Sequence, residues 1–177
     1  MEPRIARKMG QMKHDLQAVK AVLSEYFEAN GHSLLSEVAR HTGRTMYAKT
    51  FHAYLTLLQI CPYDEERRSF LVVYNGHLPR QLKIICHEIM HFQFLHYYRA
   101  VCKNKGLNEK QIQDLKEAMT VLLNQPSFRR FHLAYDQGYE PHQELRKFIT
   151  TAWHARRSYR FFLDRCIEKT KQVIPRT

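Results

Sequence analysis

The sequence feature that most constrains the fold is a long apolar segment between Pro79 and Gly106 that contains neither glycine nor proline. Large apolar side chains recur at helical spacing from about Arg80 to Val101, and Lys105 with Gly106 then supplies a stop signal. The repeat is made by Ile84, Ile85, Ile89, Phe92 and Leu95. A helix with this stripe needs partners that cover it, so the segment predicts a helix that is largely buried.

The chain before this segment begins with helical patterns. Apolar residues at helical spacing predict a helix over residues 11–29, and Asn30-Gly31 is typical of a helix end. A second, short helix is predicted over about Leu34 to Arg40. We therefore expect residues 1–48 to form an N-terminal helical part.

Two strands are predicted next. Phe51 to Ile60 is rich in aromatic and branched residues, and Ser69 to Tyr74 is a compact apolar run. The residues Cys61-Pro62-Tyr63-Asp64 indicate a turn between them. We therefore expect two adjacent, antiparallel strands.

The chain after the buried helix predicts two more helices. Asn108 has the position of an N-cap for a helix whose apolar stripe ends before Pro126. A loop is predicted from Gln125 to Pro141, and a final helix from about His142 to Lys171. The pattern as a whole predicts an α+β fold, in which a small, mostly antiparallel sheet packs on several helices.

The length of 177 residues fits a single domain, so we expect the helical part to precede one core that spans residues 49–177. The formal net charge of +11 favours an acidic partner or nucleic acid without identifying one. No apolar leader follows Met1, and no apolar run is long enough to cross a bilayer. We expect a soluble, cytoplasmic protein without membrane contact, whose four scattered cysteines are reduced and mostly buried.

Residues 87–91 read His-Glu-Ile-Met-His. Because His87 and His91 are four residues apart, one helical turn places both imidazoles on the same face, where they can share a tetrahedral zinc ion. Glu88 is offset by roughly 100° around the helix axis and stands beside that position. Zinc lowers the pKa of its water to roughly 7, and a neighbouring carboxylate can take the proton. The motif predicts a zinc hydrolase with Glu88 as general base.

A catalytic zinc ion needs a third protein ligand. His96 is the nearest candidate in sequence, but nine residues after His87 it points to the opposite side of the helix. Glu117 opens the stretch 117–127, which has no other charged residue, so this carboxylate is expected to lie inside and to require a cation. We therefore predict Glu117 as the third ligand.

A strand, a His-Glu-x-x-His helix and a second helix with a glutamate together resemble the gluzincins, zincin metallopeptidases with a glutamate ligand. Glu117 follows His91 by 26 residues, and the segments HEIMHFQF, KEAMTVLLN and GYEPHQELR resemble small bacterial proteins described as zinc metallopeptidases. The likeness covers about residues 70–165. It implies a zincin-like fold and hydrolysis of peptide bonds. The strand from Phe70 to Tyr74 resembles the zincin edge strand that aligns an extended peptide, although an internal strand fits equally.

The resemblance also bears on residues around the metal. Gluzincins often carry an acidic residue four positions after the ligand glutamate, whereas this chain has Val121, so Thr120 or Asn124 is the suggested substitute. The reaction also needs a donor to the oxyanion of its intermediate. Tyr139 or His142 is expected to supply it, since zincins commonly use a tyrosine or a histidine in this way.

Two other functions stay open. A His-x-x-x-His pair followed by His96 loosely resembles a family of bacterial ribosomal-RNA endonucleases, which would make the chain a metal-dependent nuclease. The other is a noncatalytic basic binding module, either derived from a peptidase that has lost its activity or a helical protein that docks on nucleic acid through its last helix. The candidate face of that helix comprises Trp153, Arg156, Arg157, Tyr159 and Arg160.

Overall fold

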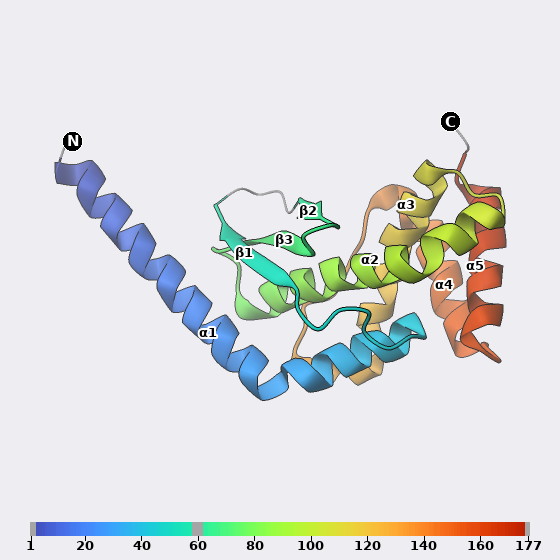
Figure 1. Ribbon diagram of the computed structural model, residues 1–177, viewed down its shortest axis with the longest axis horizontal. Coiled ribbons are helices and arrows are strands. Elements are labelled where there is room, and N and C mark those ends of the chain that lie inside the picture. The colour runs from blue at the N-terminus through green and yellow to red at the C-terminus, as the bar shows by residue number, and fades with distance from the viewer. Residues whose placement is uncertain (1–2, 58–61, 176–177) are drawn as a thin grey trace.

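The computed structural model describes residues 3–57 and 62–175. It is an α+β fold in which helices dominate and a small mixed sheet packs against the long helix α2 (Figure 1). None of the helices in this part of the chain combines the length and the hydropathy needed to cross a bilayer. The predicted end of the first strand and Cys61 lie outside the described residues.

Helix α1 (Pro3–Thr42) is continuous, so the predicted helix end at Asn30-Gly31 and the separate short helix after it are wrong. A glycine inside a helix costs only about 1 kcal/mol. The second half of α1 packs on α2 and buries Leu34 and Val38, which outweighs that cost. In Figure 1, α1 bends near its middle, and its first half extends away from the rest of the molecule.

The sheet has three strands, β1 (His52–Thr56), β2 (Tyr63–Asp64) and β3 (Ser69–Val73), in the order β1-β3-β2. β1 runs parallel to β3, so the predicted antiparallel pair is wrong, and only the short β2 is antiparallel to β3. The chain between β1 and β3 is long enough to return in the same direction, as parallel pairing requires. β3 is the central strand, so of the two positions left open for Phe70–Tyr74 the structure shows the internal one.

Helices α2 (Leu78–Asn104) and α3 (Glu109–Met119) confirm two predicted helices. His77 is the N-cap of α2, and its side chain accepts a hydrogen bond from the backbone N–H of Arg80. α3 begins at the predicted N-cap, Asn108, which forms a capping box with Gln111. A short 3-10 helix, η1 (Thr120–Asn124), continues from the end of α3.

The final predicted helix is two helices, α4 (Gln143–His154) and α5 (Tyr159–Val173). Ser158 begins α5 by accepting a hydrogen bond from the backbone N–H of Phe161. The break lets the apolar faces of both helices pack on each other, with the rings of Trp153 and Phe162 5.2 Å apart between centroids. The predicted loop before α4 contains two short 3-10 helices, η2 (Pro126–Phe131) and η3 (Glu140–His142).

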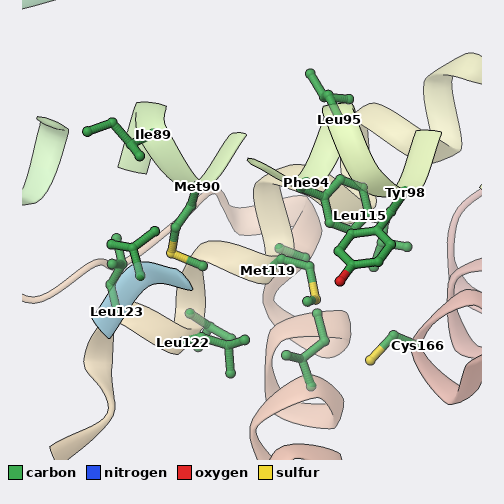
Figure 2. Packing of buried hydrophobic residues seen from close by; sticks show 14 of the residues in the cluster. Ile89, Met90, Phe94, Leu95, Tyr98, Leu115, Met119, Leu122, Leu123 and Cys166 are labelled. Carbon is green, nitrogen blue, oxygen red and sulfur yellow. The ribbon is translucent and has the colours of Figure 1, made fainter. Parts of the chain in front are cut away.

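One hydrophobic core joins α2, α3, η1 and α5. Figure 2 shows Met90 of α2 close to Leu122 and Leu123 of η1, and Cys166 of α5 on the far side of the same cluster. Cys86, Cys102 and Cys166 are free and buried, as expected. This packing fixes α2 against α3 and therefore sets the separation between the side chains that the two helices carry.

Candidate metal centre

The two predicted histidine ligands and the predicted glutamate ligand lie together where α2 faces α3. His87 and His91 are one turn apart on α2, and their ring centroids are 4.2 Å apart. Glu117, near the end of α3, places its Oε2 atom 3.4 Å from the Nε2 atom of each histidine. The fold thus brings one carboxylate oxygen and two imidazole nitrogens to the same point.

These separations match those between the ligands of a zinc ion. Ligand atoms about 2.0–2.1 Å from a tetrahedral ion lie about 3.3 Å from one another. The contacts are not aligned as hydrogen bonds to Glu117 Oε2, and this atom and His91 Nε2 are buried without a hydrogen-bond partner among the described residues. Leaving a buried polar atom unpaired costs about 1–3 kcal/mol. A cation between these atoms would satisfy them.

Glu88 is the second carboxylate at the centre. Its Oε2 atom is buried, has no hydrogen-bond partner in the described chain and lies 3.5 Å from Nδ1 of His91. His87, Glu88 and His91 each offer a ligand atom, and these three atoms lie within 4.8 Å of one another. Oε2 of Glu117 lies close to Nε2 of both histidines, whereas Oε2 of Glu88 lies close to the other nitrogen of His91. Glu88 therefore stands beside the centre.

Asp136 is a part of the site that the sequence reasoning missed. His87 Nδ1 donates a hydrogen bond of 2.8 Å to Oδ2 of Asp136, whose side chain is 2% exposed. A histidine held in this way has its ring orientation fixed and presents its other nitrogen to the metal. The only available signal was that Asp136 is the one carboxylate between Glu117 and Glu140.

Asp136 is itself held on several sides. Its backbone N–H donates to Oδ1 of Asn124 over 2.8 Å, and Nδ2 of Asn124 donates to its carbonyl over 2.9 Å. The buried Arg146 of α4 donates to Oδ1 of Asp136 over 3.0 Å and to Oγ1 of Thr120 over 2.9 Å. Thr120 and Asn124, the suggested substitutes for an acidic residue, therefore support Asp136 and Arg146 and do not contact His87 through a hydrogen bond in the described chain.

The charges of the centre shift its pKa values strongly. Burial lowers the pKa of His87, but the hydrogen bond to Asp136 and the contact with Glu117 outweigh it and raise the value to about 9. Burial would raise the pKa of Glu117, yet the histidines and Lys116 hold it well below its usual range. Lys116, 3% exposed, lies 3.1 Å from Oε1 of Glu117, which leaves Oε2 to face the histidines. Without a metal, His87 therefore carries a proton that an ion must displace.

The two candidate oxyanion donors lie in different surroundings. Tyr139 is exposed, and its phenol pKa is raised first by burial and then by the charges of Glu117 and Glu88. His142 is buried, and its Nε2 atom lies 3.0 Å from Oδ1 of Asp114 on α3. The imidazole of His142 is thus engaged with Asp114, and it packs edge-on against the ring of Tyr139.

The residues of the alternative functions lie elsewhere. His96 is exposed and stacks on Tyr47, with ring centroids 4.2 Å apart, and it does not join the group of possible metal ligands in the described chain. Trp153 is only 4% exposed, and the guanidinium of Arg156 covers its ring at 3.5 Å. Trp153 therefore contributes no exposed ring to the candidate nucleic-acid face, whereas Arg157 and Arg160 are exposed, and the nucleic-acid alternative stays a prediction.

Comparison of this chain with models of protein families, with curated proteins and with solved structures found no match. Inferences about its function therefore depend on the residues and the geometry of the centre itself.

Proposed function

We propose that this chain is a zinc-dependent peptidase in which His87, His91 and Glu117 hold the metal and Glu88 is the general base. One observation carries the proposal: both Nε2 atoms lie 3.4 Å from the same buried oxygen of Glu117, at the spacing of zinc ligands. Two histidines and one glutamate are a ligand set of catalytic zinc, which leaves a fourth position open to water or substrate.

A zinc ion bound by these side chains would polarise a substrate carbonyl and lower the pKa of water. Glu88 is suited to accept a proton there, because its Oε2 atom is buried, unpaired among the described residues and next to His91. The same carboxylate can then give the proton to the amine nitrogen that leaves when the peptide bond breaks.

The neighbouring residues fit supporting roles. Asp136 holds the imidazole of His87 and keeps its proton on Nδ1, so that Nε2 is available as a ligand. The hydroxyl of Tyr139 is the donor that we assign to the oxyanion, since its ring is exposed and the charges of Glu117 and Glu88 contribute to raising its pKa, whereas His142 is held by Asp114. Arg146 and Asn124 keep the segment around Asp136 in place.

The test combines metal analysis with proteolysis. We expect one zinc ion per chain in the purified protein and in Glu88→Gln, and only a small fraction of that amount in Glu117→Ala. The wild type should cleave unfolded casein. The cleavage rate of Glu88→Gln should be about 10²–10⁴-fold lower, which is the range for removal of a general base. His96→Ala is the matched control and should retain both zinc and activity.

Three results would count against the proposal. If Glu117→Ala kept its zinc, Glu117 would be excluded as the third ligand. If Glu88→Gln cleaved casein at the wild-type rate, Glu88 would be excluded as the general base. Degradation of RNA in place of casein, lost in His96→Ala, would favour the nuclease alternative. Thermal unfolding of each variant separates loss of the site from loss of the fold.

A further inference from the structure

A second candidate site lies on the other side of α2. The middle of α1, the sheet and α2 surround an apolar hollow of about 390 Å³. Phe27 of α1, Leu55 of β1 and Ile89 of α2 are among the side chains that line it. Ile89 and its neighbour Ile85 are each roughly 200° around the helix axis from His87. The hollow and the metal centre therefore occupy opposite faces of the same helix.

The hollow has a basic rim. Lys20 of α1 and Lys49, which precedes β1, line it, and among the described residues no carboxylate does. Both lysines are exposed, and neither forms an ion pair in the part of the chain that the structure describes. An apolar surface with unpaired cations at its edge is complementary to an apolar occupant that carries acidic groups.

The hollow also borders an open strand edge. β1 is the edge strand of the sheet on this side. On the side that faces β3, the N–H of His52 donates to Arg68 and the carbonyl of Thr56 accepts from Tyr74. Because bonding direction alternates along a strand, the backbone groups of Ala53 and Leu55 point away from β3, and no other strand of the described chain pairs with them.

The side chains of Ala53 and Leu55 line the hollow. A strand added beside β1 would therefore place every second side chain over the same hollow. Main-chain pairing at an open edge provides affinity, while a pocket for alternate side chains provides selectivity. The three features, an apolar hollow, a basic rim and an open edge, thus fit one kind of occupant.

We propose that the hollow and the open edge of β1 form a docking site for an extended, acidic segment of a partner protein. The backbone of the segment pairs with Ala53 and Leu55, its alternate apolar side chains enter the hollow, and its carboxylates meet Lys20 and Lys49. A second copy of this chain is a poor occupant, because its net charge of +11 repels the same lysines. The site is separate from the metal centre and does not depend on peptidase activity.

The experiment selects 12-residue peptides from a random display library on the full-length protein and measures the affinity of the enriched peptides by fluorescence anisotropy. We expect enriched peptides to combine acidic residues with alternate apolar residues. The double variant Lys20→Glu/Lys49→Glu should weaken their binding at least tenfold, roughly the effect of losing one charge-assisted contact. The control Lys147→Glu/Arg157→Glu has the same net charge, changes two exposed residues outside the hollow, and should bind as the wild type does.

A second variant tests the strand edge. Ala53→Pro removes an N–H that points away from β3, so the ladder between β1 and β3 is retained while pairing from outside is blocked. Binding should fall in this variant and should be unchanged in Glu88→Gln and in the presence of a chelator, which distinguishes docking from substrate binding at the metal centre. Circular dichroism checks the fold, and the exposed lysine variant keeps the test valid if Ala53→Pro unfolds.

Three outcomes would overturn the proposal. Enriched peptides without acidic residues, or equal affinity for the wild type and the lysine variant, would exclude the basic rim. Equal affinity for a folded Ala53→Pro would exclude strand pairing. A hollow that takes up dodecanoate but selects no peptide would be a site for a lipid carboxylate.

Discussion

The two faces of α2 differ in what determines their structure. On the face toward α3, His87 and Glu88 belong to a group of buried ionisable residues, and Asp136 and Arg146 hold that group through specific hydrogen bonds. On the face toward the sheet, Ile89 packs by shape alone and borders the hollow. The buried polar atoms of one face therefore hold the side chains of the centre in a fixed geometry, whereas the other face stabilises the fold through burial of apolar surface. On this one helix, the residues of the candidate metal centre and the residues that stabilise the fold thus lie on different faces.

A substitution on the apolar face should affect stability without affecting metal binding. Ile89 is 4% exposed, so Ile89→Ala should lower the free energy of unfolding by about 2–5 kcal/mol, which is roughly 30-fold or more in the folding equilibrium. We expect the lower end, because the site already borders open space. Urea unfolding measures the loss, and zinc per folded chain should stay the same. Loss of zinc from the folded variant would contradict the separate roles of the two faces.

A substitution on the polar face should weaken zinc binding more than it lowers stability. Asp136→Asn removes the negative charge that His87 and Arg146 share, and zinc affinity should fall about 10–100-fold, as for other residues that orient a ligand histidine. Chelator competition measures the affinity. Asp114→Asn is the matched control, because Asp114 contacts His142 and should not change zinc binding. Equal affinity in Asp136→Asn and the wild type would show that the ring of His87 needs no such support.

The pH dependence of zinc binding tests whether His87 is a ligand on the polar face. The pKa of His87 is raised from 6.5 to about 9, so zinc must displace a proton below that pH. Zinc affinity should therefore rise about tenfold per pH unit between these two values and level off above them. Titrations with zinc at several pH values measure the slope, and a flat profile would show that His87 is not protonated in the metal-free protein.

Without metal, the stability should change in the opposite direction. The pKa of His87 is higher in the folded than in the unfolded chain, so its contribution to stability is fully present below pH 6.5 and is lost as the pH rises through about 9. Thermal unfolding with a chelator should show this loss. With saturating zinc, the melting temperature should instead stay nearly level over the same range, because the gain in zinc affinity with pH offsets the loss of the proton's contribution.

The smallest effect is expected for His96. Its imidazole is exposed and stacks on Tyr47, remote from the face that carries His87. His96→Ala should therefore leave zinc content and zinc affinity unchanged, as measured by mass spectrometry of the metal and by chelator competition. Loss of zinc in this variant would support three histidine ligands and contradict the ligand set with Glu117.

Local signals explain which parts of the fold the sequence predicts. The period of apolar residues determines α2 and α3, and Asn108 has the chemistry of an N-cap. Their ends follow from short-range interactions. The position of Glu117 was also predictable, because a lone carboxylate in an apolar stretch must find a cation when it is buried.

The rest depends on contacts between distant residues. Gly31 stays within a helix because the second half of α1 is covered by α2, and no local rule includes that packing. The parallel pairing of β1 with β3 joins residues that are distant in the sequence, such as His52 and Ser69, so no local signal sets its direction. Asp136 reaches His87 only because Asn124 and Arg146 fix an otherwise irregular segment, so its role has no fixed spacing in the sequence.

X-ray absorption at the zinc edge tests the central claim most directly, because it reports the atoms around the metal. With zinc held by His87, His91 and Glu117, the protein should show two imidazole nitrogens and carboxylate oxygen at about 2.0–2.2 Å, and Glu117→Ala should lose the carboxylate contribution together with most of the bound zinc. A sulfur shell at about 2.3 Å, or an unchanged spectrum in Glu117→Ala, would contradict the proposed centre.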